Sequence, residues 1–242
     1  MAKLADFKDL ALDILFPKFC AGCGKQGKYI CGSCELFISE SSLICPVCGK
    51  VSFTGETHFN CNRGYKLDGL TSVWDYEGII KKLIKNVKYG GAFDAINELL
   101  EKSFRVIIND SAGRFASFLQ FMALDNTYIT YVPMFFKKEK RRGFNQAEII
   151  AKKIGKKINK PVIGLIDKIR ETEDQASLNK EKRKVNLKDN FKILQGQVPN
   201  CLGQALVVDD VFTTGATMQE CCKVLKKAGA KKVWGFALAK TV

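Results

Sequence analysis

The sequence predicts an α/β protein in which a doubly wound, mostly parallel sheet follows a small cysteine-rich domain. From about residue 71 onward, strand-like and helix-like segments alternate, as is typical of parallel sheets with helices on both faces. Seven of the ten cysteines lie between Cys20 and Cys61, so the N-terminal part has a different composition. We therefore expect an N-terminal helix and a cysteine-rich domain over 1–66, and an α/β domain over 67–242.

The predicted strands and helices follow from composition and periodicity. Branched and aromatic residues mark five strand-like segments, which are 71–76, 128–134, 161–167, 205–211 and 231–239. Apolar residues at helical spacing mark three helices, which are 77–88, 144–158 and 218–230. In sheets of this kind, ligands bind beyond the carboxyl ends of the strands.

The N-terminal segment lacks the features of a signal peptide. Asp6, Asp9 and Asp13 interrupt its apolar residues, and the usual order of charged, apolar and small-residue regions is missing. We expect a short amphipathic helix here instead. No stretch approaches the ~18 consecutive apolar residues of a membrane-spanning helix. The sequence therefore predicts a cytoplasmic protein without a membrane-spanning segment.

The cysteine-rich part contains three Cys-x-x-C pairs and one His-x-x-Cys pair. Each pair can direct two ligands at one ion, so four pairs predict a double zinc ribbon with one Cys₄ and one Cys₃His site. Full coordination by protein makes this zinc structural. A single zinc with a degenerate second site, or a redox or iron–sulfur role, stays open. The eight candidate ligands are Cys20, Cys23, Cys31, Cys34, Cys45, Cys48, His58 and Cys61.

The order in which the four pairs combine is open at this stage. The first and second pairs are separated by 7 residues, and the third and fourth by 9. These gaps are shorter than the ~15–20 residues typical between such pairs in zinc sites. An interleaved arrangement, first pair with third and second with fourth, is therefore an alternative to sequential pairing.

The charge of the chain predicts an acidic partner. The formal net charge is +14, and the segment 137–188 holds 17 Lys or Arg against 7 Asp or Glu. Such a surplus favours nucleic acid, a nucleotide or a phosphorylated substrate. A solvated, lysine-rich surface is the alternative reading.

The segment 205–218 predicts an anion-binding turn. An apolar strand ends on Asp209 and Asp210, and the residues after it are small and rich in hydroxyl groups. A helix N-terminus, threonine hydroxyls and a glycine suit a phosphate, whereas two carboxylates would repel it. The carboxylates fit a ligand whose sugar hydroxyls donate hydrogen bonds to them, or they fit Mg²⁺ that also contacts the ligand. The segment therefore predicts a ribose 5′-phosphate site with magnesium; a capped turn with a chance acidic pair is the alternative.

The stretch VVDDVFTTGAT, residues 207–217, resembles the phosphoribosyl-pyrophosphate (PRPP) motif of type I phosphoribosyltransferases. The resemblance implies that fold for the large domain. It also implies that the two aspartates contact the ribose hydroxyls and that the following loop holds the 5′-phosphate. By position, these residues are Asp209, Asp210, Thr213, Thr214, Gly215, Ala216 and Thr217.

Two further stretches, with the double zinc ribbon ahead of them, resemble the ComF family of competence proteins. They are YVPMFFKKEKRRGFNQAEIIA at 131–151 and IRETEDQASLNKEKRKVNLKDNF at 169–191. The resemblance covers nearly the whole chain and implies a role in natural transformation. His58 departs from it, because the family more often has cysteine there.

The same resemblance suggests further ligand contacts. The stretch IKNVKYGGAFD, residues 84–94, resembles a pyrophosphate loop, and its candidate residues are Lys88, Gly90 and Gly91. The basic stretch is a candidate lid that would neutralise a leaving group, or a surface that contacts a phosphate backbone. Its candidate residues are Arg141, Arg142, Phe144, Arg170 and Arg183.

Three functions are consistent with these motifs. The first is a competence factor that binds PRPP with Mg²⁺ and single-stranded DNA, and assists DNA uptake into the cytoplasm. The second is an active phosphoribosyltransferase with an unknown acceptor. The third is a zinc-ribbon interaction module for a competence helicase, with a vestigial ligand site. No acceptor pocket or general base is identifiable, so the sequence leaves catalysis undecided.

Overall fold

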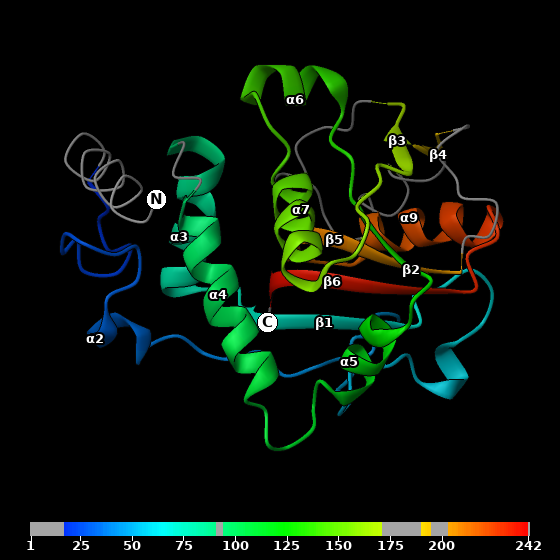
Figure 1. The fold of residues 1–242 in the computed structure, drawn as a ribbon, viewed down its shortest axis with the longest axis horizontal. Helices are drawn as coiled ribbons and strands as arrows, with labels where there is room; N and C mark the ends of the chain where they lie inside the picture. The colour runs from blue at the N-terminus through cyan, green and yellow to red at the C-terminus, as the bar shows by residue number, and fades with distance from the viewer. Residues whose placement is uncertain (1–16, 91–93, 171–189, 195–202, 242) are drawn as a thin grey trace.

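The computed structural model describes residues 17–90, 94–170, 190–194 and 203–241. A sheet of four parallel strands lies at the centre, in the order β1-β6-β5-β2 (Figure 1). The predicted parallel α/β architecture is thereby confirmed. The strands are β1 (Gly69–Asp75), β2 (Thr127–Tyr131), β5 (Gln204–Phe212) and β6 (Lys232–Lys240).

Helices cover both faces of the sheet, each over its own apolar core (Figure 1). One face packs against α3 (Gly78–Gly90), α4 (Asp94–Ile108), α5 (Ala116–Ala123) and α7 (Gln146–Ile158). The other packs against α9 (Ala216–Lys227). Three of these helices, α3, α7 and α9, were predicted; α4 and α5 were not. Because β6 and most of β5 are buried on both faces, their sequences are apolar throughout rather than alternating.

The segment predicted as a strand at 161–167 is divided between two sheets. Its first residues run parallel to β2, where the N–H of Ile129 donates to Pro161 and the N–H of Ile163 to Ile129, both at 2.9 Å. The chain then leaves the central sheet at Gly164. It continues as β3 (Ile166–Lys168), which pairs antiparallel with β4 (Phe191–Ile193).

The direction of the chain reverses between β2 and β5. After β2, α7 carries the chain outward on one face, to the segment at 161–163; after β5, α9 carries it the other way, to β6, on the opposite face. A doubly wound sheet has its ligand crevice at this kind of switch point, beyond the carboxyl ends of the strands. The helix α6 (Phe136–Arg142) follows the carboxyl end of β2 and stands away from the sheet (Figure 1).

The segment at 17–66 covers the free edge of β1 and shares its core. Ile30 and Leu43 are buried among residues of the central sheet. The N–H of Ser41 donates to Val73 (2.8 Å), and the N–H of Leu70 donates to Gly55 (2.8 Å). These bonds satisfy backbone groups that an open edge would expose. The segment also contains α2 (Gly32–Glu35) and the 3₁₀ turn η1 (Phe59–Cys61).

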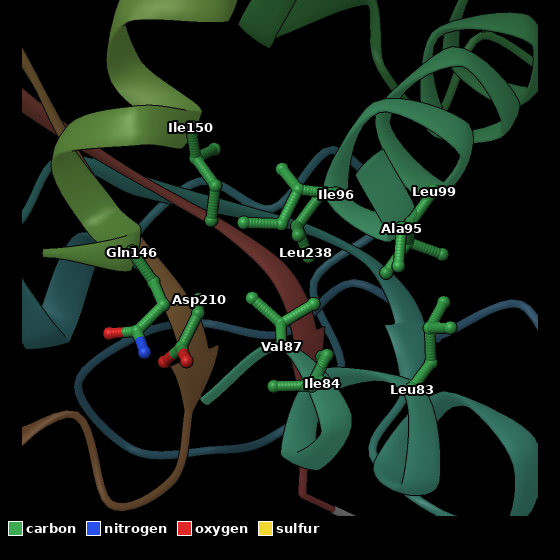
Figure 2. A pocket seen from close by; sticks show the side chains of 10 residues that line it. All are labelled: Leu83, Ile84, Val87, Ala95, Ile96, Leu99, Gln146, Ile150, Asp210 and Leu238. Atoms are coloured by element: carbon green, nitrogen blue, oxygen red, sulfur yellow. The ribbon is translucent and has the colours of Figure 1, made fainter. Parts of the chain in front are cut away.

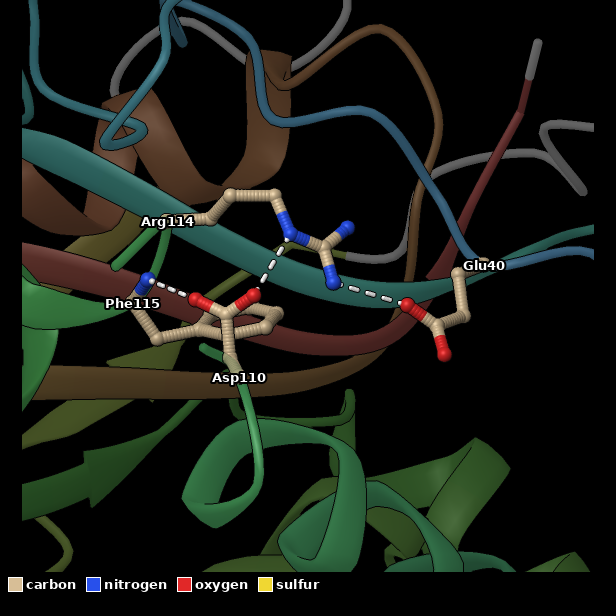
Figure 3. Close-up of polar contacts among 4 residues, drawn as sticks. All are labelled: Glu40, Asp110, Arg114 and Phe115. Atoms are coloured by element: carbon tan, nitrogen blue, oxygen red, sulfur yellow. Dashed lines mark hydrogen bonds and ion pairs between the residues drawn. The ribbon is translucent and has the colours of Figure 1, made fainter. Parts of the chain in front are cut away.

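An arginine ties this segment to the loop between α4 and α5 (Figure 3). Arg114 donates from Nη2 to Glu40 Oε2 at 2.8 Å and from Nε to Asp110 Oδ1 at 2.9 Å. The domain boundary at residue 66 stays a prediction. The amphipathic helix predicted at the N-terminus lies outside the described residues. Among the helices that are described, none combines the length and apolar character needed to cross a membrane.

Candidate functional site

Residues 20–61 form two separate clusters of metal ligands. Within each cluster the ligand atoms lie within 4.8 Å of one another, as tetrahedral zinc with Zn–S bonds of about 2.3 Å requires. The first two pairs combine, and the third combines with the His-x-x-Cys pair, so the interleaved alternative is wrong. The clusters are Cys20, Cys23, Cys31 and Cys34, and then Cys45, Cys48, His58 and Cys61.

The imidazole of His58 is oriented as a zinc ligand. Its Nε2 lies 3.1 Å from the carbonyl oxygen of Val51, which can only accept, so Nε2 carries the proton. Its Nδ1 then faces the thiols with a lone pair, 3.4 Å from Cys48 Sγ. A carbonyl that fixes the second ring nitrogen is the usual support of a zinc-bound histidine.

Backbone groups prepare the first cluster for a cation. Burial alone would raise the pKa of Cys20, but hydrogen bonds from the backbone of Cys31, Cys23 and Gly22 outweigh burial and lower it to about 6. The N–H of Cys31 lies 3.4 Å from Cys20 Sγ. Zinc binds the thiolate, which these groups favour. Both clusters are therefore sites for structural zinc.

A polar hollow of about 190 Å³ lies at the carboxyl end of β5. Its walls come from the end of β5, from the turn into α9, from Tyr76 after β1, and from Lys88 in α3. The hollow brings together most of the residues that the sequence predicted for ribose phosphate. They are Asp209, Asp210, Thr213, Gly215, Ala216, Thr217 and Lys88.

The two aspartates point to opposite faces of the sheet, because side chains alternate along a strand. Asp210 faces α3 and α7, and its Oδ2 lies 2.6 Å from Nζ of Lys88. Asp209 faces α9, and its Oδ1 accepts a hydrogen bond from the N–H of Asp210 at 2.8 Å. The pair therefore presents two separate carboxyl groups to the hollow rather than a bidentate chelating site.

Burial and neighbouring charges set the protonation of this site. Burial raises the pKa of Asp209 to about 8, and the charge of Asp210 acts in the same direction. Burial alone would lower the pKa of Lys88, but the charges of Asp210 and Asp209 outweigh it, so this pKa is raised. At neutral pH the floor of the hollow thus holds a mostly protonated Asp209 beside an Asp210–Lys88 ion pair.

The turn from β5 into α9 depends on Gly215. Its φ is +73°, in the left-handed region, and a Cβ there would lie 2.5 Å from the ring of Phe212. Only glycine therefore fits the turn without strain. The helix α9 begins at the next residue, so its unpaired N–H groups lie at the hollow.

Thr214 lies on the other side of this turn. Its Oγ1 accepts from the N–H of Ala216 at 3.4 Å, and its side chain lines a second hollow of about 240 Å³ between α9 and the second zinc cluster. Pro46, Lys66 and Gln219 also line this second hollow. No sequence pattern indicates this second hollow, because its walls come from segments more than 140 residues apart along the chain.

Those predicted lid or DNA-binding residues that the structure describes do not line the polar hollow. Arg141 and Arg170 are exposed, while Phe144 is partly buried against the core. Arg142 donates to Gln146 Oε1 at 2.9 Å. Gly90 ends α3, whereas Gly91 and Arg183 lie outside the described residues.

Gln146 is a buried polar residue beside the hollow that the sequence analysis missed. Figure 2 shows it next to Asp210, at the edge of an apolar space lined by α3, α4 and α7. The side chain is only 4% exposed, and Nε2 has no hydrogen-bond partner among the described residues. Asn145, which caps α7 by accepting from the N–H of Ala147 at 3.0 Å, places Gln146 on the buried side of the first turn.

Fold and sites together define a class of protein: a double zinc ribbon joined to a parallel α/β domain with an acidic strand end and a hydroxyl-rich turn. Residues 11–63 match the model of the double zinc ribbon domain. Relatives that resemble nearly the whole chain carry names related to competence and DNA. The predicted resemblance to ComF proteins is therefore confirmed.

Three of these relatives illustrate the similarity. Competence protein F of Haemophilus influenzae is 27% identical over 226 residues, which is 91% of this chain and 90% of that protein. DNA utilization protein YhgH of Escherichia coli K12 is 26% identical over 88% of this chain and 91% of that protein. Competence protein ComFC of Streptococcus pneumoniae is 25% identical, covering 87% of each.

Proposed function

We propose that this protein acts in competence, where it binds a 5′-phosphorylated ribose such as PRPP in the polar hollow and single-stranded DNA on its basic surface. The names of the relatives support the role in competence and DNA use. The observation that supports this choice of ligand is the hollow itself, where two carboxyl groups, a helix N-terminus and a lysine converge. Each of these groups suits a different part of a ribose phosphate.

Different residues of the hollow would bind different parts of the ligand. The backbone N–H groups at the start of α9 and the hydroxyls of Thr213 and Thr217 would donate to the 5′-phosphate. Asp210, as a carboxylate, would be a strong acceptor for a ribose hydroxyl, and the protonated Asp209 would accept through its carbonyl oxygen. Lys88 would face the pyrophosphate, and its pairing with Asp210 would weaken as the ligand entered. Magnesium, which the sequence predicts together with PRPP, would neutralise pyrophosphate charge there.

Calorimetric titration of the zinc-loaded protein with PRPP and Mg²⁺ tests this proposal. We expect saturable binding that the Asp209→Asn/Asp210→Asn variant weakens at least tenfold, because each amide offers one acceptor oxygen instead of two and a neutral acceptor is weaker than a carboxylate. Ribose 5-phosphate and pyrophosphate, titrated separately, divide the affinity between the two ends of the ligand. Asp125→Asn, an exposed carboxyl before β2, is the matched control. No binding by the parent protein would refute the ligand assignment.

The DNA part of the proposal rests on α6. Five of its seven residues are Lys or Arg, it stands away from the sheet beyond the carboxyl end of β2, and Phe136 is 70% exposed at its start (Figure 1). Cations next to an exposed ring suit a phosphate backbone with stacked bases. Fluorescence anisotropy with oligo-dT should show that Arg141→Ala makes the negative slope of log K against log salt less steep by about 0.7. An unchanged slope in Arg141→Ala would show that this arginine of α6 does not contact the DNA backbone.

Active phosphoribosyl transfer is a separate question from binding. The one histidine of the chain lies in the second zinc cluster, so no histidine is available as a base at the hollow. Release of pyrophosphate from PRPP in the presence of an acceptor would establish transfer. If the double aspartate variant still supports natural transformation, whereas Cys20→Ser or Cys45→Ser does not, the third hypothesis is favoured. In that hypothesis the zinc ribbon is an interaction module that docks a helicase.

A further inference from the structure

The side chain of Gln219 connects the second zinc cluster to the start of α9. Its Nε2 donates to the carbonyl oxygen of Pro46 at 3.0 Å, and its Oε1 accepts from the N–H of Leu67 at 3.2 Å. Both bonds bridge more than 150 residues of sequence. Gln219 itself lies in the first turn of α9, where its N–H donates to Gly215 at 2.9 Å. The side chain therefore spans from the zinc ribbon to the turn that would hold the phosphate.

One of the two residues that Gln219 contacts, Pro46, lies between ligands of the second zinc cluster. Pro46 follows the ligand Cys45, which is fully buried, and precedes the ligand Cys48 by two residues. Leu67, also fully buried, packs in the same core as Met218 of α9. Zinc at this cluster would hold the backbone around Pro46 in one conformation, because a structural site orders the knuckle that binds it.

Among the described residues, few hydrogen bonds from other segments hold the turn before α9. The N–H of Thr241 donates to the carbonyl oxygen of Phe212 at 3.0 Å, where the turn begins. Within the turn, the hydroxyl of Thr241 donates to the carbonyl oxygen of Thr213 at 3.4 Å, and the hydroxyl of Thr214 accepts from the N–H of Ala216 at 3.4 Å. Both contacts are long for hydrogen bonds that involve a hydroxyl. The two bonds of Gln219, by contrast, have ordinary lengths, and the one to Pro46 ties α9 to the segment that holds the ligands Cys45 and Cys48.

We propose that Gln219 is a positioning residue that couples the second zinc site to the phosphate turn. Zinc fixes Pro46, Gln219 transmits this to the first turn of α9, and the turn is held ready for the anion. The inference rests on the proposed ribose-phosphate site. Coupling between two sites is reciprocal, so bound ligand must also retain zinc more firmly.

Chelator-driven zinc release from the full-length, zinc-loaded protein tests the coupling, with PRPP and Mg²⁺ as the probe. We expect PRPP to slow the release of one of the two zinc ions by about fivefold, a modest coupling for two linked sites. Gln219→Ala should abolish this protection. Gln219→Glu keeps the acceptor for Leu67 but loses the donor to Pro46, and it should also lose most of the protection. Glu220→Ala, the next residue in the same hollow, should behave like the parent protein.

A second measurement separates failure of the coupling from failure of the ligand assignment. Hydrogen exchange of the first turn of α9, without ligand, should accelerate on removal of zinc and in Gln219→Ala, but not in Glu220→Ala. PRPP that binds the parent without slowing zinc release would overturn the coupling and leave the ligand site intact. If PRPP does not bind, the proposed function fails; unchanged exchange after zinc removal would then overturn the positioning role as well.

Discussion

Nζ of Lys88 lies 2.6 Å from Oδ2 of Asp210, so a lysine from α3 supplies a positive charge beside the acidic pair. The two side chains are 23% and 13% exposed. An ion pair sheltered to this degree neutralises Asp210 without metal. Lys88 therefore acts as a resident cation of the ligand-free site.

Replacing Lys88 with methionine should make the stability of the protein depend on Mg²⁺. Asp210 would lose its partner, and we expect roughly 1–3 kcal/mol lower stability because a charged hydrogen bond is lost. Added Mg²⁺ should then raise the melting temperature of Lys88→Met but not that of the parent. Lys85→Met, an exposed lysine of the same helix, is the control. An equal response of parent and variant to Mg²⁺ would contradict the resident-cation role.

The carboxyl group of Asp209 should make stability depend on pH. Its pKa is about 8 in the folded protein, against an ordinary value of 3.8, mainly because of burial. A raised carboxyl pKa means that the folded state holds an extra proton, so stability falls as pH rises from about 4 to about 8. Asp209→Asn lacks this proton exchange, and its advantage over the parent should grow to on the order of 5 kcal/mol at pH 8, because one unit of pKa shift corresponds to about 1.4 kcal/mol.

Urea unfolding of parent and Asp209→Asn across this pH range is the measurement. Asp125→Asn, which removes an exposed carboxyl, should follow the parent. An advantage of Asp209→Asn that is constant with pH would show that the substitution acts through packing instead of protonation.

The chemistry of the site was predictable where it is local in sequence. The acidic pair, the glycine and the threonines lie within nine residues, 209–217, and a strand followed by a helix N-terminus fixes their relative positions. Lys88 could be placed only through a resemblance. Its contact with Asp210 depends on how α3 packs beside β5, and no local pattern records that.

Contacts between distant segments escaped prediction for the same reason. Gln219 is an ordinary polar residue of an amphipathic helix until Pro46 and Leu67 are found beside it. The pairing of the zinc ligands was ambiguous because ligand spacing alone allows two solutions. Hydrogen bonds such as that from His58 to Val51 orient one ligand set, and these depend on the folded backbone.

Removing the imidazole of His58 should empty one zinc site. We expect about one zinc per chain in His58→Ala, against two in the parent, because a site with three ligands binds zinc less tightly than a complete one. His58→Cys restores a fourth ligand and should retain both ions. Metal analysis after gel filtration measures the content. Two ions in His58→Ala would show that His58 is not a ligand.

The Arg114 network should stabilise the junction between the ribbon and the large domain (Figure 3). The side chain of Asp110 is 4% exposed, and its Oδ2 also accepts from the N–H of Phe115 at 3.3 Å. Burial alone would raise the pKa of Asp110, but the hydrogen bonds of Arg114 and Phe115 outweigh it, so this pKa is lowered. A lowered carboxyl pKa contributes stability above the unfolded pKa near 3.8, and this stability is lost as pH falls through the folded value.

Asp110→Asn should therefore cost roughly 1–2 kcal/mol at pH 7, where the charged acceptor is lost, and progressively less below pH 4. Acid also releases zinc, but it does so in both proteins, so the difference between parent and variant at each pH is the quantity to follow in urea unfolding. Arg114→Met should also lower stability at pH 7, since it removes the cation beside the buried carboxylate of Asp110 and the ion pair with Glu40. A cost of Asp110→Asn that persists unchanged to pH 3 would mean that the amide fits the site poorly and that the charge of Asp110 contributes nothing.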